Sequence, residues 1–119
     1  MTIKTYLGFD VGTKRTGIAI ANSLTAHASG IETVIHHKDG STNWPQLEKL
    51  INKHQADIFV VGLPLDDKGK EQEMTFIARS FGRKLEQRFS KEVVFIDEYL
   101  SSSEAKNQLK WHYAHKNAD

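Results

Sequence analysis

The chain has 119 residues, 39% of them hydrophobic and 26% charged, a composition that favours one packed domain and excludes a wholly disordered chain. A formal net charge of +1 excludes a strongly basic nucleic-acid-binding coat, although a local basic patch remains compatible with it. No cysteine and no long apolar run occur, so we expect neither disulfides nor thiolate zinc sites nor a membrane span, and interpret residues 1–119 as a single cytoplasmic domain.

The first third of the chain predicts three strands joined by short links. The first strand ends at Asp10, the second covers residues 17–22, and the third covers residues 29–37. The first link is short enough for a hairpin, in which Gly12 and Gly17 are expected to supply backbone angles that other residues resist. Consecutive strands with short links predict an antiparallel meander.

Apolar residues recur at helical spacing in two later segments. One opens at Trp44, with Asn43 and Gln46 as a capping pair. The second amphipathic helix is marked by Met74, Ile77, Ala78, Phe81 and Leu85. A third helix is expected after the capping box formed by Ser101 and Glu104.

Two further strands alternate with these helices. Residues 58–63 are almost wholly apolar, which predicts a central strand covered on both faces, and residues 93–96 form the last strand. The order predicts an α/β fold with a five-stranded mixed sheet, an antiparallel meander followed by two parallel strands, flanked by helices. Ligands of such sheets gather beyond the carboxyl ends of the parallel strands.

Acidic residues follow the ends of two predicted strands. Asp10 closes the first strand, and Asp97 and Glu98 follow the last. Carboxylates from separate elements are what two magnesium ions require when they catalyse phosphodiester cleavage. Asp10, Glu98 and Asp97 are therefore candidate catalytic residues, with Asp10 and Glu98 as metal ligands and Asp97 as a supporting or helix-entry residue. The alternative is that they are ordinary solvated acids at strand ends.

Cations lie beside Asp10 in the hairpin. Thr13, Lys14 and Arg15 could hold scissile or flanking phosphates through contacts that weaken as salt is added. The alternative is a solvated turn without a ligand.

Three stretches together resemble the YqgF family, also called RuvX, of ribonuclease H-like proteins. They are FDVGTKRTGIAIA at 9–21, VVGLPLDDKG at 60–69 and DEYLSSSEA at 97–105. The resemblance implies a ribonuclease H-like α/β/α fold and a cytoplasmic nuclease that uses Mg²⁺ or Mn²⁺. Its implied role is processing the 5′ end of pre-16S ribosomal RNA, with resolution of Holliday junctions in four-way DNA as the older alternative.

The resemblance also implies roles for individual residues. Asp10 matches the catalytic aspartate of the family's first strand, and Glu98 matches the acid that ends its last strand. The signature positions expected to contact the substrate are Thr13, Lys14, Arg15, Gly62 and Pro64.

Two positions depart from the family pattern. Tyr99 stands where the family usually has an arginine. The family normally continues into a further helix bearing its last carboxylate, whereas this sequence ends at Asp119, so we expect a chain shortened at its C-terminus.

Two other functions stay open at this point. Actin-like ATPases and sugar kinases also use Asp-x-Gly-x-Thr in a first hairpin, and Asp10, Gly12 and Thr13 fit that pattern. A non-catalytic RNA-binding module is the other alternative. Under any of these functions, we expect the protein to be a monomer or a homodimer.

Overall fold

The computed structural model describes residues 3–24 and 28–98, and the predicted third helix lies outside them. The described part contains β1 (Thr5–Val11), β2 (Arg15–Asn22), β3 (Ser29–Ile35), α1 (Trp44–His54), β4 (Ile58–Pro64), α2 (Glu73–Phe89) and β5 (Glu92–Glu98). Neither described helix is long and apolar enough to cross a membrane.

The five strands form one mixed sheet in the order β3-β2-β1-β4-β5. β1, β2 and β3 pair antiparallel, while β1 with β4 and β4 with β5 pair parallel. The predicted fold class, a meander followed by two parallel strands, is thus confirmed. Residues 58–63, which lie in β4, are all buried, as predicted. The middle strand of the five is β1 and not β4, because β5 is the only described strand beyond β4.

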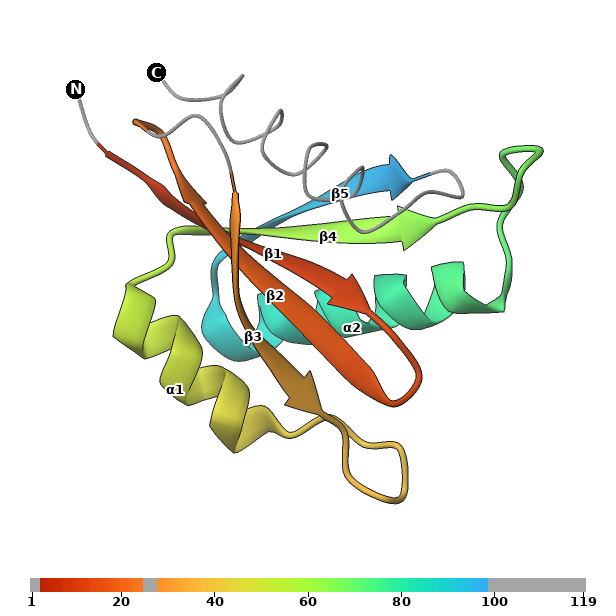
Figure 1. Ribbon diagram of the computed structural model, residues 1–119, viewed down its shortest axis with the longest axis horizontal. Helices are drawn as coiled ribbons and strands as arrows, with labels where there is room; N and C mark the ends of the chain where they lie inside the picture. Colours follow the sequence, from red (N-terminus) through yellow and green to blue (C-terminus); the bar gives the residue numbers. More distant parts are fainter. Residues whose placement is uncertain (1–2, 25–27, 99–119) are drawn as a thin grey trace.

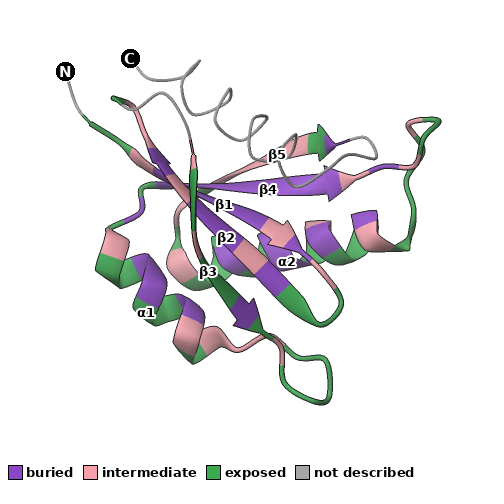
Figure 2. Ribbon diagram, viewed as in Figure 1, coloured by how far each residue is buried: buried purple, intermediate pink, exposed green. Residues whose placement is uncertain are grey.

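Both described helices lie on one face of the sheet, below it in Figure 1. The core on this face is strongly aromatic: the ring of Phe9 packs against Phe59 and Phe81, and Trp44 stacks on Phe81 with ring centroids 5.7 Å apart. Figure 2 shows the buried residues gathered along β1 and β4 and on the inward sides of the helices. The sheet is therefore held chiefly by this helix-covered core.

The opposite face of the sheet has a smaller apolar cluster. Tyr6, Ala21, Ile58 and Val60 are buried there, and no helix of the described part covers it. Because successive side chains of a strand point to opposite faces, β1, β2, β4 and β5 each contribute to both clusters. We call this second surface the Tyr6 face.

The hairpin between β1 and β2 forms as predicted, but the reason given for its glycines is wrong. Among the described residues, the glycines with positive φ are Gly40 and Gly69. Gly12 is required for space instead: a Cβ there would lie 2.7 Å from the carbonyl oxygen of Arg15, to which its N–H donates a hydrogen bond of 2.9 Å. Gly12 thus permits a close backbone approach across the turn.

Side chains close the start of each helix. The predicted cap of α1 is confirmed, since the N–H of Gln46 donates to the side-chain oxygen of Asn43 at 3.3 Å. At the start of α2, the buried hydroxyl of Thr75 accepts from the N–H of Gln72 at 3.0 Å and donates to the carbonyl of Pro64. One hydroxyl therefore ties α2 to the end of β4.

Replacing Thr75 by valine tests this link. Valine keeps the shape but leaves the Pro64 carbonyl and the Gln72 N–H without this partner, so we expect the free energy of unfolding to fall by about 1–3 kcal/mol. Urea unfolding followed by circular dichroism measures the change. Thr75→Ser, which retains the hydroxyl, should cost clearly less, and equal stability of Thr75→Val and the unaltered protein would contradict the assignment.

Candidate active site

Asp10 and Glu98 lie near the ends of two strands on the same face of the sheet. Asp10 is the penultimate residue of β1 and is half-buried, and Glu98 ends β5 with only 3% of its surface exposed. Strand alternation puts Asp10 on the Tyr6 face, and Glu98 follows Ile96, which packs against the cluster of that face. Both carboxyl groups therefore lie on the side away from α1 and α2.

The carboxyl group of Glu98 reaches over the neighbouring strand β4. A Cβ built on Gly62 would lie 1.7 Å from one carboxyl oxygen of Glu98 and 2.5 Å from its carboxyl carbon. The carboxyl group thus occupies the space that a side chain at position 62 would fill. The parallel register, with Phe9 beside Val61, brings Gly62 level with Asp10 on the adjacent strand.

Asp10 is flanked by glycine on its other side as well. Gly17 of β2 is its direct partner in the antiparallel register, and a Cβ there would approach the Cβ of Asp10 to 3.8 Å. Gly17 and Gly62 thus place no side chain beside Asp10 on either neighbouring strand.

This donor set fits a hard divalent cation, because carboxylate oxygens are the ligands that Mg²⁺ and Mn²⁺ prefer. Within residues 3–24 and 28–98, no cluster of three or more acidic or histidine side chains could hold a metal. Among the described residues, the candidate metal site thus consists of two carboxylates, those of Asp10 and Glu98, without a third acidic or histidine ligand.

Asp97 lies on the other face of the sheet. It pairs with Leu63, which belongs to the helix-covered core, and it is exposed. The hydrogen bond from Arg79 on α2 to Glu71 is the main cause that raises the pKa of Arg79, and the negative charge of Asp97 adds to this shift. The structure therefore brings Asp10 and Glu98 together and separates Asp97 from them.

The backbone next to Glu98 is fixed by the segment that follows β4. The N–H of Leu65 donates to the carbonyl of Glu98 at 2.7 Å, and Pro64 is its partner in the sheet register. Asp66 in turn accepts from the N–H groups of Lys68 and Lys70 at 2.9 and 2.8 Å. Pro64 and Gly62 thus both lie beside Glu98, and direct substrate contact by either stays a prediction.

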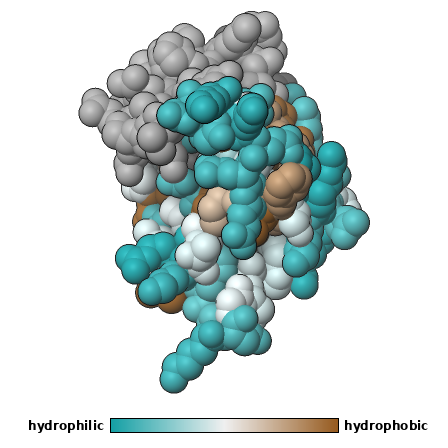
Figure 3. Space-filling model, turned by 90° about the vertical axis from the view of Figure 1, so that its right-hand side faces the viewer, coloured by the Kyte–Doolittle hydropathy of each residue, from teal (hydrophilic) through white to brown (hydrophobic). Residues whose placement is uncertain are grey.

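The predicted phosphate-binding residues lie in and beside the turn. Thr13, Lys14 and Arg15 are all exposed, directly after the strand that carries Asp10. The side of the molecule at which β1, β4 and β5 end is mainly hydrophilic, with a small hydrophobic area near its middle (Figure 3). The turn is therefore accessible to a polar ligand.

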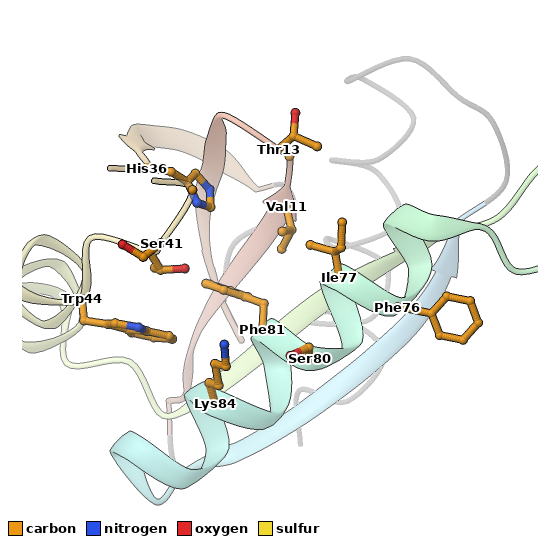
Figure 4. Close-up of a pocket in the computed structure, with 13 residues that line it drawn as sticks. Val11, Thr13, His36, Ser41, Trp44, Phe76, Ile77, Ser80, Phe81 and Lys84 are labelled. Atoms are coloured by element: carbon orange, nitrogen blue, oxygen red, sulfur yellow. The ribbon is translucent and has the colours of Figure 1, made fainter. Parts of the chain in front are cut away.

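Sequence reasoning missed a cavity on the helix-covered side of the same turn. Its volume is about 520 Å³, and it lies between the β1–β2 turn, the segment joining β3 to α1, and α2 (Figure 4). One feature of the sequence is related to this cavity. Ile77 belongs to the predicted apolar stripe of α2, but the structure leaves 37% of its surface exposed, at the cavity.

The sequence is similar to a known family along almost all of its length. A family model described as "RuvX: Holliday junction resolvase" matches residues 4–119. A protein of Aeromonas salmonicida named "putative pre-16S rRNA nuclease" is 45% identical over 92% of this chain and 77% of its own length. Proteins of the same name from Shewanella oneidensis and Saccharophagus degradans are 44% and 42% identical, over 92% and 98% of this chain and 77% and 80% of their own lengths.

The close approach of Gly62 and Glu98 is testable by a double-mutant cycle. Gly62→Ala should lower the free energy of unfolding by about 1–3 kcal/mol, because the new methyl group displaces the buried carboxyl group. In a Glu98→Ala background that cost should shrink by about 1 kcal/mol or more, since the clashing atoms are gone.

Gly30→Ala on β3 is the matched control, because a Cβ there meets nothing within 4 Å. It should change stability by less than about 0.5 kcal/mol in urea unfolding. Additive effects of Gly62→Ala and Glu98→Ala would show that the two residues do not share this space.

Proposed function

Because the chain belongs to the RuvX family, we propose that it is a metal-dependent nuclease that hydrolyses phosphodiester bonds at the 5′ end of pre-16S ribosomal RNA. The observation that carries the proposal is the Glu98 carboxyl group lying over Gly62, on the strand next to Asp10. The names of the relatives support the RNA substrate. The proposal implies a cytoplasmic protein.

Asp10 and Glu98 are the residues that would hold Mg²⁺ or Mn²⁺. A divalent ion bound there supplies an activated water and stabilises charge on the phosphate and leaving oxygens. The protein's part is to present two carboxylates from different strands at one place, and the glycines at 17 and 62 keep that place clear of other side chains. Asp97 would support the site only indirectly, through the charge of the strand end.

The turn would position the substrate backbone. Lys14 and Arg15 are exposed cations that immediately follow the metal-binding strand, and the Thr13 hydroxyl lies between them and Gly12. A chain with a net charge of only +1 must rely on such local cations, since it lacks a general attraction for polyanions. These contacts would position the phosphates without reading the sequence.

Resolution of four-way DNA is the second candidate function, favoured by the description of the matching family model. Cleavage of precursor 16S ribosomal RNA and of a four-way DNA junction should be compared in the same magnesium buffer. Faster cleavage of the junction would favour four-way DNA as the substrate and junction resolution as the function.

Asp10→Asn should lower metal-dependent RNA cleavage by about a hundredfold or more, because a catalytic metal contributes several kcal/mol to transition-state stabilisation. Glu98→Gln should have a similar effect. The measurement is the initial rate of cleavage of precursor 16S ribosomal RNA in magnesium, with circular dichroism to show that each variant is folded.

Asp97→Asn is the matched control, since it removes a carboxylate from the adjacent position on the opposite face. It should retain most of the activity. If Asp97→Asn is as damaging as Glu98→Gln, or if Asp10→Asn cleaves normally, the assignment of the two metal-binding carboxylates is wrong.

Lys14→Ala and Arg15→Ala should weaken RNA binding and also make it less dependent on salt. Each lost phosphate contact lowers the slope of log K against log salt by about 0.7–0.9. Fluorescence anisotropy across a salt series measures this slope. Lys49→Ala, an exposed lysine on α1, should leave the slope unchanged, and the same slope in all three variants would remove the turn from the RNA-binding surface.

A further inference from the structure

We propose that the cavity beside the β1–β2 turn, here called the turn pocket, binds one unpaired nucleotide of the RNA strand whose phosphate lies at Asp10 and Glu98. The inference rests on the proposed function, because it takes RNA as the substrate. It assigns a second RNA-binding site, on the opposite side of the sheet from the carboxylates.

The location of the turn pocket connects it with the carboxylate site. Asp10 points to the Tyr6 face, whereas the next residue, Val11, belongs to the helix-covered core and lines the pocket. Gly12 and Thr13 continue from Val11 along the pocket wall. A strand bound at Asp10 therefore needs only to pass over this short turn to enter the pocket.

The turn pocket has an apolar wall against which a flat ring can pack. Trp44, Ile77 and Phe81 form apolar parts of this wall, and Figure 4 shows Trp44 approaching from the α1 side while Ile77 and Phe81 point in from α2. Trp44 and Phe81 already stack on each other, so a bound base would pack against this wall without inserting between the two rings. Phe76, in contrast, points away from the cavity. The volume of about 520 Å³ lies within the range of about 300–1,000 Å³ found for small-molecule sites.

The polar groups of the turn pocket suit a nucleotide and not a purely apolar ligand. Thr13, Thr42 and Ser80 are among the residues that line it, and hydroxyl groups can donate to and accept from the edges of a base or a ribose. Lys84 contributes a cation that forms no ion pair within the described part of the chain, and its amino group extends toward the cavity in Figure 4.

None of the described residues that line the pocket is acidic. An anion attached to an aromatic ring therefore meets no acidic side chain among these residues, and the exposed Lys14 and Arg15 directly follow Thr13 of the pocket wall in the sequence. A nucleotide combines a flat ring, polar ring edges and an anionic phosphate. The pocket adjoins the end of β1, which carries Asp10. A single RNA chain can therefore reach both Asp10 and the pocket.

The first test is RNA binding without metal, so that cleavage plays no part. Ser80→Phe should fill the pocket and Lys84→Glu should reverse its charge, and each should weaken binding of a short single-stranded RNA by about tenfold, toward the low end of what one bound base contributes. Both positions are exposed on α2, so the fold should tolerate the changes. Fluorescence anisotropy with end-labelled RNA is the measurement.

Gln87→Phe and Lys49→Glu are the matched controls, because they make the same changes at exposed helical positions that do not line the pocket. They should bind nearly as tightly as the unaltered protein. Pocket variants that bind as tightly as their controls would overturn the proposal, and so would an unaltered protein that binds no single-stranded RNA.

The second test uses RNAs that lack the base at one position after another. One such RNA should bind the unaltered protein about tenfold more weakly, and that loss should disappear in Ser80→Phe. A loss that persists in Ser80→Phe would show that the base binds elsewhere. Adenosine or uridine monophosphate that binds as tightly as RNA would instead indicate a free-nucleotide site and overturn the proposal.

These results separate the turn pocket from the proposed nuclease function. Coupling between the missing base and Ser80→Phe, together with normal cleavage by Asp10→Asn, would retain the pocket and refute the catalytic site. Loss of cleavage in Asp10→Asn without any coupling would retain the nuclease and refute the pocket.

Discussion

The absence of a side chain at Gly62 is the constraint on which the candidate active site depends. Asp10 and Glu98 come from strands separated by β4, and two strand spacings amount to about 10 Å. Two carboxylates at that separation share a cation only if one of them crosses the strand between. Glu98 does so because its carboxyl group occupies the position of the missing Cβ.

The alternation of side chains along β1 and β5 divides the functional residues between the two faces. Asp10 and Glu98 lie on the Tyr6 face, whereas their neighbours Val11 and Asp97 lie on the side of α2. The aromatic core beneath the sheet fixes the strands, and the strands fix the carboxylates. The hydroxyl of Thr75 adds a direct link, since it joins α2 to the end of β4 beside Glu98.

Much of the fold follows from local patterns. Apolar periodicity predicts the strands and both described helices, and the Asn43 cap marks the start of α1. The site is only partly predictable. Asp10 and Glu98 stand out as acids at strand ends, but the steric role of Gly62 depends on the register of β4 against β5, which is a tertiary property. The sequence predicts a last strand that ends at Ile96, whereas β5 continues to Glu98, and its alternation puts Asp97 and Glu98 on opposite faces.

The turn pocket was not predictable for a related reason: its wall combines the β1–β2 turn, the segment before α1, and α2. What connects it to the carboxylates is the shortness of the turn. The hydrogen bond from Gly12 to Arg15 closes the hairpin after two residues, Thr13 and Lys14, so Asp10 and Val11, whose side chains lie on opposite faces of the sheet, are both close to the turn. A ligand that followed the turn as proposed would meet two exposed cations on a turn already closed by this hydrogen bond, which would lower the entropic cost of binding.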